Sequence, residues 1–163
     1  MIEIKPAKTK EEIKTIAGLA DIIWREHYIP IVGKSQIDYM LDKFQSAEAM
    51  ADQIHSGYEY YTMIYNDKPV GYLAIVNEAS ALFLSKIYVL KKYRGKKIGK
   101  HAMQFIEEKA KAYDKPKIRL TVNINNVHSI EVYTKLGFRN VGPLVTDIGE
   151  GFIMDDYELI KEI

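Results

Sequence analysis

The chain has 163 residues, enough to bury a hydrophobic core without disulfides or metals, and we expect a single domain over residues 1–163. Its net charge of +1 argues against a chain that seeks polyanions over its whole surface. The absence of cysteine excludes disulfides, thiolate metal sites and a cysteine nucleophile, and it favours the cytoplasm as the location.

The N-terminal half is predicted to contain a strand, three helices and a hairpin. Met1 is not followed by the basic and apolar segments of a signal peptide, so we expect none. No apolar run approaches the ~20 residues of a membrane span. Hydrophobic periodicity predicts one strand and three helices, at residues 2–5, 10–28, 35–44 and 46–56. Pro30 and Gly33 are expected to end the first of these helices. The hairpin strands that follow are predicted at 58–65 and 70–76, with a turn at Asn66-Asp67.

The C-terminal half is predicted to contain a strand–helix–strand unit followed by a helix and two strands. The expected elements are strand 82–89, helix 99–113, strand 118–122, a helix from Asn126 to Leu136, and strands 141–146 and 152–159. Gly137 is expected just beyond the end of its helix. The order of elements predicts an α+β fold with a mixed sheet of about six to seven strands, locally parallel around the strand–helix–strand unit.

The segment from Tyr93 to Lys100 lies between a predicted strand and a predicted helix, and it contains Gly95 and Gly99. Unpaired N–H groups at a helix start and the helix dipole both favour an anion there. The side chains add positive charge, because residues 86–100 include seven Lys or Arg and no acidic residue. The segment therefore predicts a site for a phosphate-bearing ligand.

The spacing argues against two common phosphate-binding motifs. A P-loop reads G-x-x-x-x-G-K-[ST], but the interval between Gly95 and Gly99 is one residue short. His101 also stands where the P-loop carries its magnesium-binding hydroxyl. A dinucleotide site requires G-x-G-x-x-G after a first strand, and the segment lacks that pattern.

Two motifs in this order resemble the signature of the GNAT superfamily of N-acetyltransferases. The loop is similar to [Q/R]-x-x-G-x-[G/A], with Arg94 at the first position, Gly99 at the last and Lys97 where glycine is usual. Residues 126–138 read N-x-x-S-x-x-x-Y-x-K-L-G-F, which resembles the stretch after the next strand in that family. The resemblance implies a GNAT-like fold, a mostly antiparallel twisted sheet with a splayed parallel pair and helices on both faces.

The resemblance also implies that acetyl-CoA is the cosubstrate and lies between the splayed strands. Its pantetheine arm would follow one strand, and its pyrophosphate would bind the N–H groups of the loop. The residues that the resemblance assigns to the cofactor are Ile87, Tyr88, Val89, Arg94, Gly95, Lys96, Lys97, Ile98, Gly99, Lys100, Asn126, Ser129 and Tyr133. We expect Asn126 to cap its helix as well. Either the Lys97 position needs no positive φ, or its side chain adds a phosphate contact.

The implied activity is direct transfer of an acetyl group to a primary amine of a polyamine, another small amino compound, a peptide or a protein. A backbone N–H near Val89 would stabilise the oxyanion, and Tyr133 would protonate the departing thiolate. Many family members place a carboxylate base on the central strand, but this strand offers only Ser85 and Lys86. The base is unassigned among Glu26, His27, Glu78 and a water chain.

Two other functions compete with this hypothesis. The missing strand carboxylate suggests a CoA-binding sensor without catalysis, and the basic segment suggests a nucleic-acid-binding module. The leading hypothesis has no nucleic-acid or membrane partner. The histidines share no spacing with carboxylates, so we expect no metal site. The acceptor is unidentified, and the oligomeric state is open between a monomer and the homodimer that the family suggests.

Overall fold

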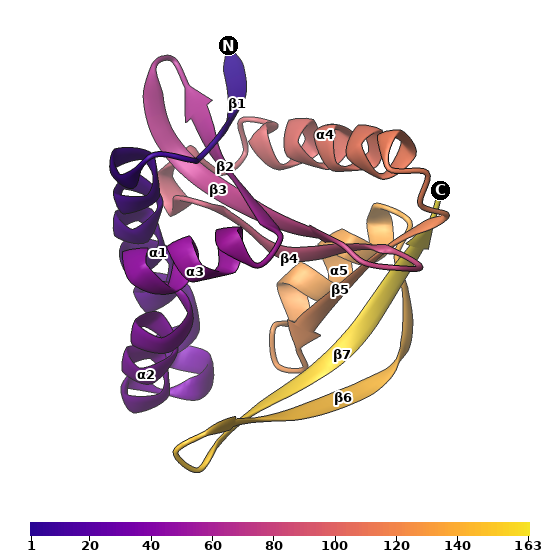
Figure 1. Ribbon diagram of the computed structural model, residues 1–163. Helices are drawn as coiled ribbons and strands as arrows, with labels where there is room; N and C mark the ends of the chain where they lie inside the picture. The colour runs from indigo at the N-terminus through magenta and orange to yellow at the C-terminus, as the bar shows by residue number, and fades with distance from the viewer.

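The computed structural model describes residues 1–163 and contains a seven-stranded sheet with the strand order β1-β2-β3-β4-β5-β7-β6 (Figure 1). The strands are β1 (Ile2–Pro6), β2 (Tyr58–Tyr65), β3 (Lys68–Asn77), β4 (Leu82–Val89), β5 (Lys117–Asn123), β6 (Arg139–Gly149) and β7 (Phe152–Glu162). Only β4 and β5 pair in parallel, because α4 crosses over between them. The predicted mixed α+β sheet is confirmed.

Helices cover both faces of the sheet, as expected (Figure 1). They are α1 (Lys10–Val32), α2 (Lys34–Phe44), α3 (Ala47–His55), α4 (Ile98–Ala112) and α5 (Val127–Lys135), with a short 3-10 turn at Lys91–Tyr93. One hydrophobic core lies between the sheet and α1, α2 and α3, and a second lies between the sheet and α4. None of these helices combines the length and the apolar character that crossing a bilayer requires.

Helix α1 begins at a capping box and is longer than predicted. The Thr9 hydroxyl accepts from the Glu12 N–H at 3.2 Å, and the Glu12 carboxylate accepts from the Thr9 N–H at 2.9 Å. The prediction that Pro30 ends the helix is wrong, because the helix continues to Val32 and ends at Gly33. Pro30 is exposed and lies in the last turn, where its missing N–H costs a single helical hydrogen bond.

The parallel pairing of β4 and β5 stops after two residue pairs, which opens the sheet. Leu82 pairs with Ile118 and Phe83 pairs with Arg119, and beyond them the strands are no longer paired. The register of β3 against β4 shifts at the same point and leaves Ser85 as a bulged residue. The expected splayed pair is therefore present, and its gap begins at the bulge.

Strands β6 and β7 form a long hairpin that contacts α2. Both strands are longer than predicted. The Tyr39 hydroxyl and the Lys43 Nζ each donate to the Ile148 carbonyl at 2.6 Å, and the Gln36 Nε2 donates to the Ile153 carbonyl at 2.8 Å. Helix α2 is thus attached to the hairpin through main-chain acceptors.

We expect Gly71→Ala to destabilise the fold, because a Cβ at this position would lie 2.3 Å from the Tyr88 carbonyl oxygen on β4. The neighbouring strand would have to move, at a cost of about 1–3 kcal/mol in the free energy of unfolding. Urea denaturation measures this change. Gly18→Ala is the matched control, since Gly18 lies in the exposed part of α1 with open space around it and should gain ~0.5–1 kcal/mol. Equal stability of the two variants would contradict the close approach.

Candidate active site

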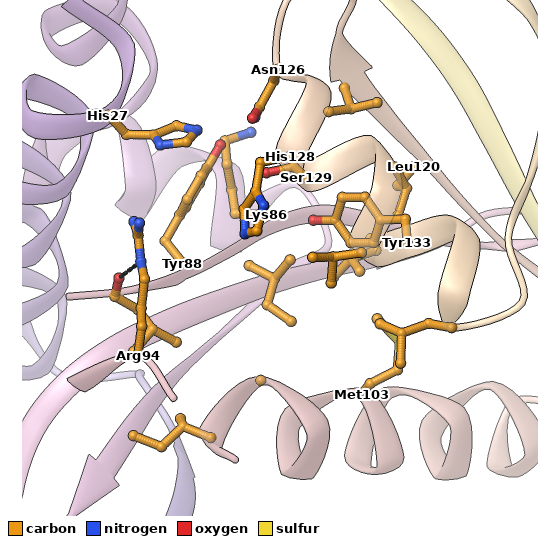
Figure 2. A pocket seen from close by; sticks show the side chains of 18 of the residues that line it. His27, Lys86, Tyr88, Arg94, Met103, Leu120, Asn126, His128, Ser129 and Tyr133 are labelled. Carbon is orange, nitrogen blue, oxygen red and sulfur yellow. Dashed lines mark hydrogen bonds between the residues drawn. The ribbon is translucent and has the colours of Figure 1, made fainter. Parts of the chain in front are cut away.

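A cavity of about 630 Å³ occupies the gap between β4 and β5 (Figure 2). Its walls come from α1, β4, the loop after β4, the first turns of α4, β5 and α5. All of the residues assigned to the cofactor line this cavity except Lys96. The Lys96 Nζ lies instead over the Tyr65 ring, 5.8 Å from its centroid. Residues far apart in the sequence are thus brought together around one space.

Strand β4 presents main-chain groups to this gap. The Leu90 N–H donates to the Val70 carbonyl at 2.8 Å, so Leu90 bonds toward β3. Because alternate residues of an antiparallel strand bond to the same neighbour, Tyr88 shares that direction, and Ile87 and Val89 face the gap. The Arg94 Nε donates to the Val89 carbonyl at 3.4 Å, which agrees with this direction (Figure 2).

The loop before α4 carries a continuous row of free N–H groups. No main-chain or side-chain acceptor in the chain bonds the N–H groups of residues 95–100. Gly95 has φ 81° and Lys97 has φ 65°, so the loop turns through two left-handed residues. The first explanation for Lys97, that its position needs no positive φ, is wrong. Lys97 holds the left-handed conformation that glycine adopts without strain, and its side chain lines the cavity.

Tyr133 lies on α5 and points into the cavity from the wall opposite β4 (Figure 2). Its ring packs against Phe138, with the centroids 5.7 Å apart. Its hydroxyl makes no hydrogen bond within the chain, so the proton remains available to a ligand. Burial is the main cause that raises the pKa of Tyr133, with Tyr28 adding to it, and the phenol therefore stays protonated at neutral pH.

Asn126 and Ser129 lie at the start of α5, on the cavity wall. Asn126 occupies the N-cap position, but its side chain makes no capping hydrogen bond, so the expectation that it caps the helix is wrong. The residue is instead 6% exposed and lies near His27 of α1.

Only one of the three side chains considered as a base lies in the cavity wall. Glu26 is exposed and outside the wall, and Glu78 pairs with Arg119 at 2.6 and 3.1 Å. His27 lines the cavity, where burial and the nearby Arg94 charge lower its pKa despite the Asn126 contact. A histidine with a lowered pKa is neutral at pH 7 and can accept a proton.

Sequence reasoning assigned no role to three residues near the His27 end of the cavity, which are Tyr28, Lys86 and Asp156. Tyr28 and Tyr88 join their hydroxyls at 2.9 Å, Lys86 lies beside them on β4, and Asp156 on β7 interacts electrostatically with Lys86 and Tyr28. One signal was present: a lysine stands on the same face as a tyrosine in an otherwise apolar strand. No such signal exists for Tyr28 and Asp156, which are distant in sequence.

The site contains no group of three or more His, Asp or Glu side chains that could hold a metal ion.

A family model described as "Acetyltransferase (GNAT) family" matches residues 16–138 of the chain. That match covers well over half of the chain. The chain belongs to the GNAT acetyltransferase family.

Relatives of this acetyltransferase-family chain include a protein named "Probable spermine N(1)-acetyltransferase" from Bacillus subtilis subsp. natto. It is 32% identical over 69 residues, which cover 42% of this chain and 45% of that protein. The match thus spans less than half the length of this relative. A spermine/spermidine N(1)-acetyltransferase of Bacillus subtilis is 30% identical over a stretch of the same length.

Solved structures share the fold over the whole chain. The PaiA N-acetyltransferase of Thermoplasma acidophilum, in complex with coenzyme A, has a TM-score of 0.83 and 21% identity, with 100% of this chain and 99% of that chain covered. A GNAT family acetyltransferase of Elizabethkingia anophelis with acetyl-CoA bound has a TM-score of 0.66 and 19% identity, with 99% and 98% covered.

We expect Lys97→Gly and Lys97→Ala to differ in stability, because only glycine adopts the left-handed conformation without strain. Both variants lose the same ammonium group, so the difference isolates the backbone. Glycine should give the higher free energy of unfolding, by about 1 kcal/mol. Chemical denaturation of the two variants side by side measures this difference, and an alanine variant as stable as the glycine variant would contradict the strain at Lys97.

Proposed function

We propose that this protein transfers the acetyl group of acetyl-CoA to a primary amine by direct attack. The observation that carries the proposal is the row of free N–H groups from Gly95 to Lys100 beside the unpaired edge of β4, in one cavity with Tyr133. A pyrophosphate suits the N–H row, and an amide-containing arm suits the strand edge. Family membership and the CoA-bound structures of the same fold support this assignment.

The proposed seating of the cofactor follows the chemistry of the walls. The pyrophosphate binds the N–H groups of residues 95–100, and Arg94, Lys97 and Lys100 neutralise its charge. The pantetheine arm bonds to the main chain of Ile87 and Val89, in place of the missing partner strand. The thioester then lies along the same strand edge, within reach of the main-chain N–H near Val89.

In the proposed reaction, the lone pair of a neutral amine attacks the thioester carbonyl and forms a C–N bond. The carbonyl oxygen becomes an oxyanion, which a main-chain N–H near Val89 stabilises. The C–S bond then breaks as the carbonyl re-forms, and Tyr133 donates its proton to the departing thiolate. The Tyr133 phenol is protonated at neutral pH, as a proton donor must be.

The amine must lose a proton before or during attack. His27 is the candidate base that lines the cavity, and its lowered pKa keeps it neutral and able to accept that proton at pH 7. Water that fills the open part of the cavity can carry the proton to His27. Glu26 and Glu78 do not line this space.

We expect acetyl-CoA to raise the melting temperature, whereas ATP and NAD should leave it unchanged, because the loop lacks both nucleotide-binding motifs. Ligand at 100 times its dissociation constant adds ~2.7 kcal/mol of stability. Differential scanning fluorimetry measures the shift. The absence of any shift at saturating acetyl-CoA would remove both the transferase and the CoA-sensor functions.

We expect Tyr133→Phe to lower kcat and to leave the dissociation constant for CoA nearly unchanged, since only the proton donor is removed. Loss of a general acid typically costs about 10²- to 10⁴-fold. Thiol release from acetyl-CoA measures the rate, without background from the cysteine-free protein. Thr134→Ala, which alters an exposed side chain on the same helix, is the control. Unchanged turnover in Tyr133→Phe would exclude the acid role, and turnover on any amine by the unmodified protein would exclude the sensor.

A further inference from the structure

The cavity wall has an uneven charge that bears on the acceptor. Its lysine and arginine side chains are Lys86, Arg94, Lys97 and Lys100, and none of its lining residues is Asp or Glu. Three of these cations belong to the loop and the first turn of α4, where the proposed pyrophosphate lies. The fourth, Lys86, extends from β4 beside Tyr88 toward the end of the cavity where His27 and Asn126 lie (Figure 2).

Lys86 has no ion-pair partner. Its Nζ donates to the Ser85 hydroxyl at 2.9 Å and to the Ser85 carbonyl at 3.2 Å, both neutral acceptors, which leaves one of its three N–H donors free. None of the salt bridges within 4.0 Å in this chain includes Lys86. Burial lowers the pKa of Lys86 to about 8, so the side chain is still mostly charged at pH 7. Lys86 is half-buried, so its charge is partly removed from water without a counter-ion in contact.

The other ionisable groups near Lys86 do not supply its partner. Asp156 on β7 is 5% exposed and lies outside the cavity wall, and burial raises its pKa to about 6. It attracts Lys86 without contact. His27 on α1 has a lowered pKa and is neutral, and Tyr28 and Tyr88 are phenols whose pKa values burial raises. The free donor of Lys86 therefore points to an anion brought by a ligand.

Acceptors of different charge fit this environment unequally. A polyamine would bring several ammonium groups into a wall that offers cations and no carboxylate, and each would lose hydration without a partner. An amine that also carries a carboxylate would pair with Lys86 and could accept a further hydrogen bond from the Tyr28–Tyr88 hydroxyl pair. Its amino group would then lie next to Ile87, at the strand edge assigned to the thioester.

We propose that the acceptor is an amino acid, a small amine with a carboxylate group, and that Lys86 binds this carboxylate. The inference rests on the proposed acetyltransferase function and narrows its acceptor. It departs from the spermine named for the relatives in Bacillus, whose matched segments cover less than half of each protein. The charge of this cavity, rather than the family, determines the choice.

The test compares each amino acid with its own carboxamide, which keeps the amine and the side chain and removes only the negative charge. Thiol release from acetyl-CoA gives kcat/KM for both members of each pair and for spermidine. We expect the acid-to-amide ratio of kcat/KM to fall about 30-fold or more in Lys86→Met, and Lys86→Arg to retain most of it. Dividing the acid-to-amide ratio of Lys86→Met by that of the unmodified protein cancels the difference in basicity between the amino groups of the acid and its carboxamide.

The controls separate this inference from the function on which it rests. Lys91→Met, which removes an exposed lysine outside the cavity, should leave the ratio unchanged. The melting shift with acetyl-CoA in Lys86→Met shows that the variant is folded and binds the cofactor. An unchanged ratio in Lys86→Met, or spermidine as the best substrate, overturns the inference while leaving the transferase intact. If no acceptor causes thiol release from acetyl-CoA, the transferase function itself is overturned.

Discussion

The early end of pairing between β4 and β5 is the constraint on which the site depends. After Phe83 and Arg119 the two strands separate, so Ile87 and Val89 carry main-chain groups that the sheet does not use. Such groups are stable only if water or a ligand bonds them. The core around α4 holds the strands apart on one face, and α1 closes the other face. The opening is therefore a product of packing on both faces.

The two faces of β4 meet different chemistry because side chains alternate along a strand. Ile87 and Val89 pack with the core beneath α4, and Tyr88 packs with the core beneath α1. Lys86 shares the Tyr88 face. The proposed cofactor and acceptor therefore approach the same strand from opposite sides, and one stretch of four residues serves both. The bulge at Ser85 sets which residue faces which ligand.

The sequence predicted the order of elements, the glycine loop and the segment around Tyr133, because each depends on local periodicity or short spacing. It failed where a distant partner decides the outcome. Asn126 lies near His27 of α1 and makes no capping hydrogen bond, and Pro30 stays in the last turn of α1. The charge of the cavity was equally hidden, because it requires knowing that Asp156 lies behind the wall and that Glu78 pairs with Arg119. Sequence rules based on local spacing do not predict contacts between residues that are distant in the chain.

The attachment of α2 to the β6–β7 hairpin has a consequence for which substitutions in the hairpin this fold tolerates. The hydrogen bonds from α2 to the hairpin all end on main-chain carbonyls, and their donors are Tyr39, Lys43 and Gln36. A carbonyl is present whatever side chain its residue carries. The hairpin can therefore change its exposed residues without releasing α2. Gly149 and Phe152 are exceptions, because a Cβ at Gly149 would lie 2.7 Å from the Tyr39 hydroxyl and the Phe152 ring packs against Tyr39 with centroids 5.3 Å apart. Exposed side chains of the β6–β7 hairpin can thus change with little effect on the position of α2, which packs against α1 beside the cavity.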